Sequence, residues 1–356
     1  MPAPIRVHVI RTRWAHWGAH AGIVRYFDYL DRNAFSLHDT PTPFDDESVA
    51  SPRRPVHDWA RGLLRHNRMP WYTLGDLRVE CDAAQRVLRD QVDVVHFLDP
   101  EHGMQFLPLW LHHLPARWRP RMVATFHQPP DLLPQILRRD VVAALDHVSV
   151  VSPDQVPFFE SCLPAERITV ILHGIDTNFF TPGPARAESA TFNCITVGHN
   201  LRDFAAVRAV AEQLRTDANI RFHVVTSATT GVEDLPNVTM HRNVSDVELR
   251  RLYQEADVLF LPLKSATANN ALLEAFACGL PAVTTALPAT HAYASAQSAL
   301  LVRDNDPPLL IAGLLRLRDD RTLRAQLGEA ARQRAVELQW ERIAPAYEAL
   351  YRGPST

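Results

Sequence analysis

Short, continuous runs of apolar residues recur along this chain, and helical patterns lie between them. A strand that is apolar on both faces is typical of a parallel sheet covered by helices on both sides. The pattern therefore predicts an α/β fold built on doubly wound parallel sheets. Runs of this kind are Ile5–Ile10, Val92–Leu98, Met122–Phe126, Val148–Val151 and Ile168–Leu172.

The series is interrupted once by a polar, proline-rich segment and then starts again. Residues 181–189 read TPGPARAES, which is the composition of a linker. The chain has 356 residues, about twice the usual size of one domain. We therefore expect two Rossmann-like domains, residues 1–182 and 190–337, facing a cleft. Strands of the second are expected at Phe192–Val197, Arg221–Thr226, Asn237–Met240, Val258–Leu261 and Ala282–Thr285.

Two segments of the first half are expected to depart from regular strands. Gly22–Leu30 follows a glycine-containing loop and has an amphipathic pattern, which predicts a helix. Asp39–His57 is acidic and rich in proline, which predicts an irregular loop.

Charge and composition exclude several classes of protein. The formal charge is −3 and the isoelectric point is near 6.6, which argues against a nucleic-acid partner. The four cysteines are scattered without zinc spacing, so we expect reduced, mostly buried thiols. The N-terminus does not resemble a signal peptide, and no run of eighteen apolar residues occurs. These features favour a cytoplasmic location, which includes the inner face of the membrane.

One stretch combines apolar bulk with three arginines. Leu107–Arg121 reads LPLWLHHLPARWRPR. Such a stretch suits either weak peripheral contact with an anionic membrane or a core-facing helix with a solvated end.

The segment from Ala256 to Pro281 carries the strongest chemical signal. It reads ADVLFLPLKSATANNALLEAFACGLP, a buried strand followed by small residues and a helix. Backbone amides at a helix start can cradle an anion. We expect Glu274 in the first turn of this helix. It would either point into the anion site or only complement the helix dipole.

This segment resembles the donor-binding signature of the retaining glycosyltransferases of family four, which have the GT-B fold. The string LLEAFACGLP at residues 272–281 is similar to the core of that signature. DHVSVVSPD at 146–154 and ILHGIDTNFFTP at 171–182 are similar to the end of the family's first domain. Trp340–Glu341 resembles the start of its C-terminal helix, so residues 340–356 are expected to cross back to the first domain.

The resemblance implies metal-independent transfer of a sugar from a nucleotide diphosphate sugar to an acceptor hydroxyl, with retention. It implies front-face attack, with the leaving phosphate helping to deprotonate the acceptor. Glu274 would accept hydrogen bonds from the ribose. Arg202 would grip the diphosphate, with His199 sharing that role. Further donor-binding positions implied are Gly198, Val244, Ala268, Asn269, Asn270 and Ala271.

Two further positions have weaker signals. His127 follows an apolar strand, and the resemblance implies a catalytic role near the transferred sugar; the alternative is a histidine bonded to its proline-rich loop. The loop containing Gly18, His20 and Gly22 would shape the acceptor side or approach the donor phosphates, or form a plain glycine turn.

One residue departs from the family pattern. Ala266 stands where the family usually has the first of two glutamates. Two alternatives therefore stay open: a GT-B sugar-nucleotide epimerase or hydrolase, and a nucleotide-sugar-binding protein that has lost catalysis. No metal and no resident cofactor are expected. The co-substrate would be of the UDP or GDP type, and the acceptor would be a saccharide, a lipid-linked molecule or a small molecule.

Overall fold

The chain folds into two compact α/β units. The computed structural model describes residues 3–13, 18–20, 22–43, 59, 62, 70–90, 92–184 and 190–353. The first unit contains residues 1–17, 27–172 and 343–356, and the second contains residues 18–26 and 173–342. The second unit thus takes in the short segment 18–26, which lies within the sequence range expected for the first domain.

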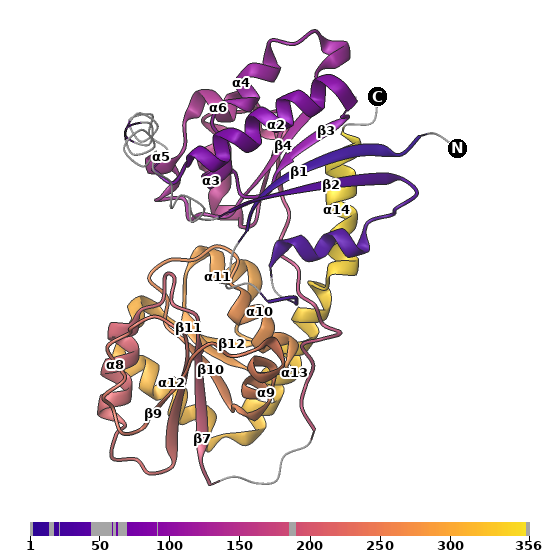
Figure 1. Cartoon of the computed structure of the whole chain (residues 1–356). Helices are drawn as coiled ribbons and strands as arrows, with labels where there is room; N and C mark the ends of the chain where they lie inside the picture. The colour runs from indigo at the N-terminus through magenta and orange to yellow at the C-terminus, as the bar shows by residue number, and fades with distance from the viewer. Residues whose placement is uncertain are drawn as a thin grey trace. The chain divides into compact units, whose positions relative to one another are not determined.

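The first unit is built on a parallel sheet of six strands in the order β2-β1-β3-β4-β5-β6 (Figure 1). β3 is buried along its whole length and β4 at every residue after Arg121, as their continuous apolar sequence predicts. The strands are β1 (Ile5–Arg13), β2 (Phe35–Pro43), β3 (Val94–Phe97), β4 (Arg121–Phe126), β5 (His147–Val150) and β6 (Ile168–Val170). The helices are α2 (Leu74–Asp90), α3 (Pro100–Gly103), α4 (Leu107–His112), α5 (Leu133–Ile136), α6 (Arg139–Ala143) and α7 (Val156–Glu160).

The second unit repeats this plan with a parallel sheet of six strands in the order β12-β11-β10-β7-β8-β9. The strands are β7 (Phe192–Val197), β8 (Ile220–Val225), β9 (Val238–His241), β10 (Val258–Leu261), β11 (Ala282–Thr285) and β12 (Ala299–Val302). The helices are α8 (Phe204–Gln213), α9 (Asp246–Glu255), α10 (Asn270–Ala277), α11 (Pro288–Tyr293), α12 (Pro307–Asp319) and α13 (Arg321–Glu337).

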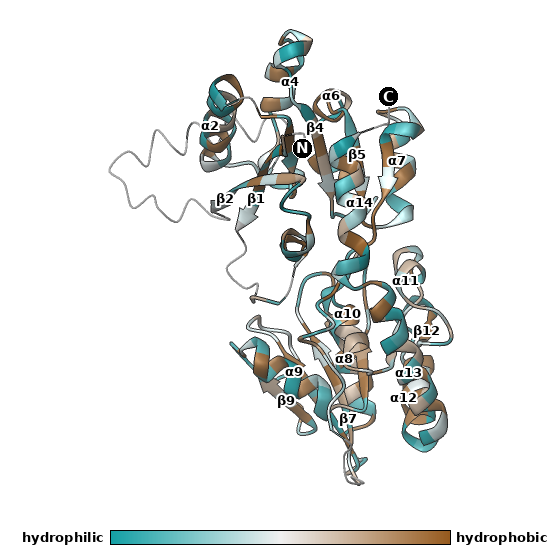
Figure 2. Ribbon diagram, turned by 90° about the vertical axis from the view of Figure 1, so that its right-hand side faces the viewer, coloured by the Kyte–Doolittle hydropathy of each residue, from teal (hydrophilic) through white to brown (hydrophobic). Residues whose placement is uncertain are grey.

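Helices of the second unit differ in how many sides they bury. Every residue of α10 from Ala271 to Ala277 is buried, so this helix is enclosed by its neighbours. By contrast α9 buries Leu252 and Tyr253 and exposes a charged side, a two-sided character that Figure 2 shows in its mixed colours. The enclosed helix is the one that carries Glu274.

The last helix, α14 (Trp340–Arg352), begins in the second unit and continues into the first. Trp340 is buried in the second unit, where its ring lies so close to Gly174 that a Cβ there would approach it to 2.4 Å. Tyr351 belongs to the first unit and shares a hydrogen bond of 2.8 Å with His96 Nδ1. The sequence prediction that the final helix returns to the first domain agrees with this division.

One expectation about local structure was wrong, and another was met by a different kind of helix. Asp39–Pro43 is not an irregular loop but the second half of β2, and its prolines are tolerated because β2 is an edge strand. Residues 44–57 of that prediction lie outside the described residues. Within the expected helix Gly22–Leu30 the structure has a 3-10 helix at Ile23–Tyr29. The short strand β12 was not predicted.

Two other sequence predictions concern cysteines and membrane spans. All four cysteines are free; Cys194 and Cys278 are buried, whereas Cys81 is exposed and Cys162 is half-buried. Among the residues that the structure describes, no helix is long and apolar enough to cross a bilayer.

Candidate donor site at the start of α10

The loop between β10 and α10 places an uncrowded helix start at the carboxyl edge of the second sheet. Asn269 caps the helix, because its side-chain oxygen accepts from the amide of Leu272 at 3.3 Å. The first amides of a helix have no intrahelical acceptor, which leaves those of Asn270 and Ala271 for an external one. Ala268 and Asn270 are half-buried, so this end of the helix is reachable.

Arg202 folds back over the loop that follows β7. Its Nε donates to the carbonyl of Val197 at 3.0 Å, and its Nη1 donates to that of Asn200 at 2.8 Å. Its Nη2 donates to Asn269 Oδ1 at 3.3 Å, which joins this loop to the start of α10. Burial lowers the pKa of Arg202 to about 10, so the guanidinium stays charged at neutral pH.

Gly198 is required where the chain turns toward Arg202. Its φ is +82°, in the region that favours glycine. A Cβ at this position would also lie 3.0 Å from Arg202 Nη2. The next residue, His199, is exposed. The structure therefore brings together Gly198, Arg202 and Asn269 and leaves the His199 side chain in solvent.

Glu274 is buried one turn further along α10. It lies beyond the first turn, so the expectation of a first-turn position was wrong; the capped start at Asn269 sets this register. The helix-dipole effect falls off within the first turn, which weakens the alternative that Glu274 serves only the dipole. Its Oε2 accepts from the hydroxyl of Tyr253 at 2.9 Å. Burial raises the pKa of Glu274 to about 7, although Tyr253 and Arg202 act in the opposite direction.

Val244 lies at the turn before α9. Ser245 caps that helix by accepting from the amide of Glu248 at 3.2 Å. Val244 itself is half-buried, and no side-chain role follows from its position.

Gly18 and His20 belong to the second unit, where they contact Asp246 and Asp176. The His20 amide donates to Asp246 Oδ2 at 3.2 Å, and a Cβ at Gly18 would overlap that carboxylate. His20 Nδ1 lies 2.8 Å from Asp176 Oδ2, and its ring stacks on Phe179 with centroids 3.6 Å apart. Gly22 has a φ of +87°. The loop belongs to the second unit, and its expected role stays a prediction.

His127 belongs to the first unit and follows β4 at the carboxyl edge of the sheet. Its Nε2 donates to the carbonyl of Leu98 at 2.8 Å, and because a carbonyl only accepts, Nε2 carries a proton. Its amide donates to the buried carboxyl of Glu101, which also accepts from Gln128. The ring is half-buried and firmly held.

The segment Leu107–Arg121 is partly a core element. Leu107, Pro108 and Leu111 of α4 are buried, and Arg119 pairs with Asp146 at 2.7 Å. Trp110 and Trp118 are nevertheless 41% and 58% exposed.

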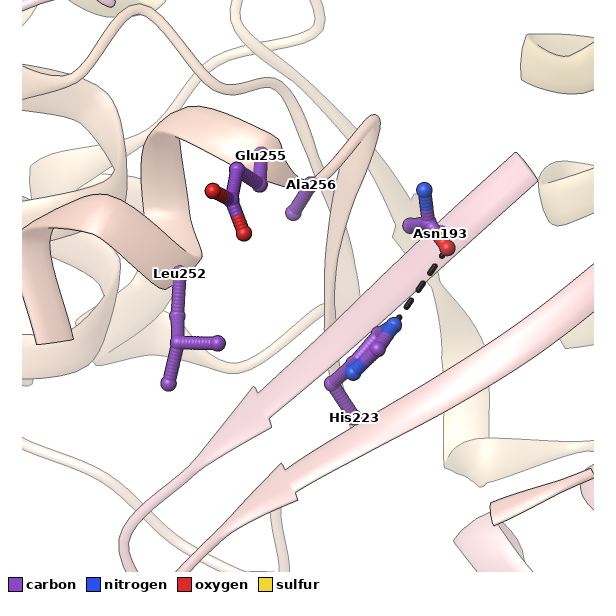
Figure 3. Close-up of a pocket in the computed structure, with 5 residues that line it drawn as sticks. All are labelled: Asn193, His223, Leu252, Glu255 and Ala256. Carbon is purple, nitrogen blue, oxygen red and sulfur yellow. Dashed lines mark hydrogen bonds between the residues drawn. The ribbon is translucent and has the colours of Figure 1, made fainter. Parts of the chain in front are cut away.

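A cavity of about 250 Å³ lies elsewhere in the second unit (Figure 3). It is lined by Asn193, His223, Leu252, Glu255 and Ala256, and His223 Nε2 lies 3.3 Å from Asn193 Oδ1. Asn193 is near the amino end of β7 and Ala256 precedes β10, so the cavity is at the amino edge of the sheet. Ligands of open α/β sheets bind at the carboxyl edge, where α10 begins. Within the described ranges, no group of three His, Cys, Asp or Glu side chains is arranged to hold a metal.

Comparison with known families agrees with this arrangement. Residues 33–179 match the family described as Glycosyltransferase Family 4, and residues 200–320 match Glycosyl transferases group 1. The two matches do not overlap and together cover well over half of the chain. The chain belongs to glycosyltransferase family four.

Curated relatives in this family match over part of their length. The D-inositol 3-phosphate glycosyltransferase of Corynebacterium diphtheriae is 27% identical over 215 residues, which cover 52% of this chain and 50% of that protein. The MMP alpha-(1->4)-mannosyltransferase of Mycolicibacterium hassiacum is 25% identical over 249 residues, covering 66% and 59%. The chain thus spans about half the length of the curated relatives that it matches.

Solved structures extend the likeness to the whole fold. Sucrose-phosphate synthase from Thermosynechococcus elongatus has a TM-score of 0.72 at 14% identity, covering 97% of this chain and 98% of that one. HepE from Anabaena, in complex with UDP-glucose, has a TM-score of 0.66 at 13% identity, covering 97% and 100%. The chain therefore has the GT-B fold of these structures.

Asn269 is expected to support both the helix and Arg202. Replacing it with alanine removes the cap, which costs about 0.5–2 kcal/mol of unfolding free energy, and frees Arg202 from α10. Asn269→Asp is the matched variant, because aspartate caps equally well but adds a negative charge. We expect it to keep the stability in denaturant unfolding and to weaken nucleotide binding. Full nucleotide affinity in the aspartate variant would mean that no phosphate lies at the start of α10.

Proposed function

We propose that this chain transfers a sugar from a nucleotide diphosphate sugar to an acceptor hydroxyl, with retention and without a metal ion. The observation that carries the proposal is the helix start at Asn269–Ala271. There, Asn269 caps the helix and accepts from the Arg202 guanidinium, whose charge also acts on the buried Glu274. Family membership supports the same reaction class.

The chemistry of the leaving group explains why these residues suit the reaction. Breaking the bond between the sugar and the diphosphate builds negative charge on the phosphate. Amides at a helix start and a guanidinium held in place stabilise such charge, and they need no reorganisation when it forms. Gly18 and His20 are proposed to approach the same phosphates.

The donor is proposed to be of the UDP or GDP type and to carry a hexose. HepE was solved with UDP-glucose, and one relative is described as a mannosyltransferase; both support a hexose donor. The acceptor is proposed to meet the first unit, which carries His127.

A peripheral membrane contact remains a prediction. It would run through the exposed side chains of Trp110, Trp118 and Arg117, the last of which lies 5.3 Å from the Trp118 ring centre. Amphipathic aromatic and basic side chains of this kind suit the headgroup region of a bilayer.

A thermal-shift panel tests the proposed function. UDP, GDP, ADP and dTDP, with their common sugar conjugates, are added in the presence of a chelator. We expect one base to raise the melting temperature, because a ligand at about a hundred times its dissociation constant stabilises by roughly 2.7 kcal/mol. No shift with any of these ligands would contradict the proposal.

The ligand that binds then separates the remaining alternatives. Release of free sugar or of an isomerised sugar nucleotide, without any acceptor, would favour the hydrolase or the epimerase. Binding with no turnover, and turnover appearing only after Ala266→Glu, would favour a protein that has lost catalysis.

Replacing His127 with alanine is expected to spare nucleotide binding and to lower transfer. Its position in the first unit is the reason, because the nucleotide is proposed to bind the second. General acid–base or positioning contributions are typically about 10²–10⁴-fold in rate. His147→Ala is the control. That histidine also belongs to the first unit and bonds Thr169 at 2.8 Å, but it begins β5, at the amino edge of the sheet. If the native protein and the His127 variant transfer sugar at equal rates with saturating acceptor, His127 has only a structural role.

A further inference from the structure

Tyr253 forms a hydrogen bond with Glu274 from a different helix. Its side chain is only 1% exposed, and Glu274 is 4% exposed. The hydroxyl of Tyr253, on α9, reaches across to Glu274 Oε2, on α10, at 2.9 Å. A buried hydroxyl or carboxyl costs free energy when it has no hydrogen-bond partner, and in this pair each group is the partner of the other.

The charged and titratable groups around Glu274 come from several elements. Asp246 and Tyr253 lie on α9, and Arg202 follows β7; all three act on the carboxyl. Cys278 lies just after α10, and burial and the charge of Glu274 raise the pKa of its thiol. Arg332 of α13 donates to the carbonyl of Ala277 at 2.6 Å.

These neighbours do not all favour the same protonation state of Glu274. Burial and Asp246 raise its pKa, whereas the Tyr253 hydrogen bond and Arg202 lower it, and the balance stands at about 7. Burial also raises the pKa of Tyr253 well above its usual range, so the phenol remains a donor at every working pH.

We propose that Tyr253 is a positioning residue for donor binding: its hydroxyl favours the ionised form of Glu274 and orients the carboxylate to accept the ribose hydroxyls. This inference rests on the proposed function of the site. A carboxylate has about four lone-pair directions, so one bond from Tyr253 to Oε2 leaves acceptors for two ribose hydroxyls. A protonated Glu274 has fewer, and donor binding therefore strengthens as the pH rises through neutrality.

Tyr253→Phe tests this by removing a single oxygen atom and keeping the ring, which packs edge-on against Phe180. The sugar nucleotide is the ligand, because the terminal phosphate of a free nucleoside diphosphate itself titrates near about pH 6. Its dissociation constant is measured by calorimetry from about pH 5.5 to 9, on both sides of the Glu274 transition.

The native protein is expected to gain affinity through about pH 7 and then to level off. In Tyr253→Phe the midpoint should move up by about one to two pH units, with roughly tenfold weaker binding at neutral pH. Tyr293→Phe is the control: it is equally buried in the same unit, and its hydroxyl accepts from the His173 amide at 2.9 Å. It should leave the midpoint unchanged.

A double-mutant cycle with Glu274→Gln separates positioning from packing. If Tyr253 acts through Glu274, Tyr253→Phe has no further effect on affinity in the Glu274→Gln background. An equal loss in both backgrounds, or an unmoved midpoint, would overturn the inference.

Carbon-13 NMR of the Glu274 carboxyl, assigned by its loss in Glu274→Gln, reads the same titration without ligand. Failure of the native protein to bind any sugar nucleotide would count against the proposed function, whereas this titration would still decide the role of Tyr253. An unchanged Glu274 midpoint in Tyr253→Phe contradicts that role.

Discussion

Glu274→Ala is expected to weaken sugar-nucleotide binding by roughly 10- to 150-fold, since a hydrogen bond to a charged group is worth about 1.5–3 kcal/mol. The carboxyl is buried on α10, and its loss would leave the ribose hydroxyls without their charged acceptor. Turnover should fall with affinity, because the ribose contact also fixes the position of the diphosphate. Calorimetry and a product assay measure the two effects.

Glu274→Gln provides the control for this prediction. The amide keeps the shape of the side chain and one acceptor oxygen, so its loss of affinity should be smaller and independent of pH around neutrality. Unchanged affinity and turnover in a folded Glu274→Ala protein would show that the ribose does not bind this carboxyl.

Arg202→Ala is expected to weaken nucleoside diphosphate binding by roughly 10- to 100-fold and nucleoside binding hardly at all. The guanidinium lies in the loop between β7 and α8, where it is held by the carbonyls of Val197 and Asn200, and its Nη2 reaches Asn269 at the start of α10. Its charge is thus fixed beside the amides proposed to receive the diphosphate. The nucleoside diphosphate affinity of Arg202→Lys should lie between those of the native protein and Arg202→Ala, because lysine keeps the charge and loses the planar fork of the guanidinium.

Arg208→Ala is the matched control for Arg202. This arginine of the same unit is ion-paired to Asp234 at 2.6 Å near the surface of α8. It should leave both affinities unchanged. Equal losses for the nucleoside and the nucleoside diphosphate in Arg202→Ala would instead mean that the residue only supports the loop.

Buried parallel strands were the most predictable part of the fold. β7, β10 and β11 have the bounds that their apolar runs predict, because strands covered on both faces need continuous apolar sequence. β2 was missed because an edge strand accepts acidic residues and prolines that would disrupt a central one.

The local parts of the candidate site were also predictable. Small residues between β10 and α10, the cap before α9 and the glycine after β7 are all signals within a few residues of sequence. The exact start of α10 was harder to predict. Because Asn269 caps the helix, Glu274 lies beyond its first turn.

Contacts between distant segments could not be predicted. Tyr253 looks like one more apolar position of an amphipathic helix, and only the packing of α9 beside α10 reveals its hydrogen bond to Glu274. Asp246 similarly reads as a first-turn acid, whereas in the structure it also accepts from the amide of His20. Tyr253 and Glu274 are 21 positions apart and His20 and Asp246 are 226 apart, and no spacing rule relates residues at either separation.

We propose that a nucleoside diphosphate binds the second unit at the start of α10. A crystal structure with the nucleoside diphosphate selected by the thermal-shift panel is the decisive test. We expect phosphate oxygens within hydrogen-bond distance of the Asn270 and Ala271 amides and of Arg202, with ribose hydroxyls on Glu274. A nucleotide bound elsewhere, such as in the cavity beside His223 and Asn193, would contradict it.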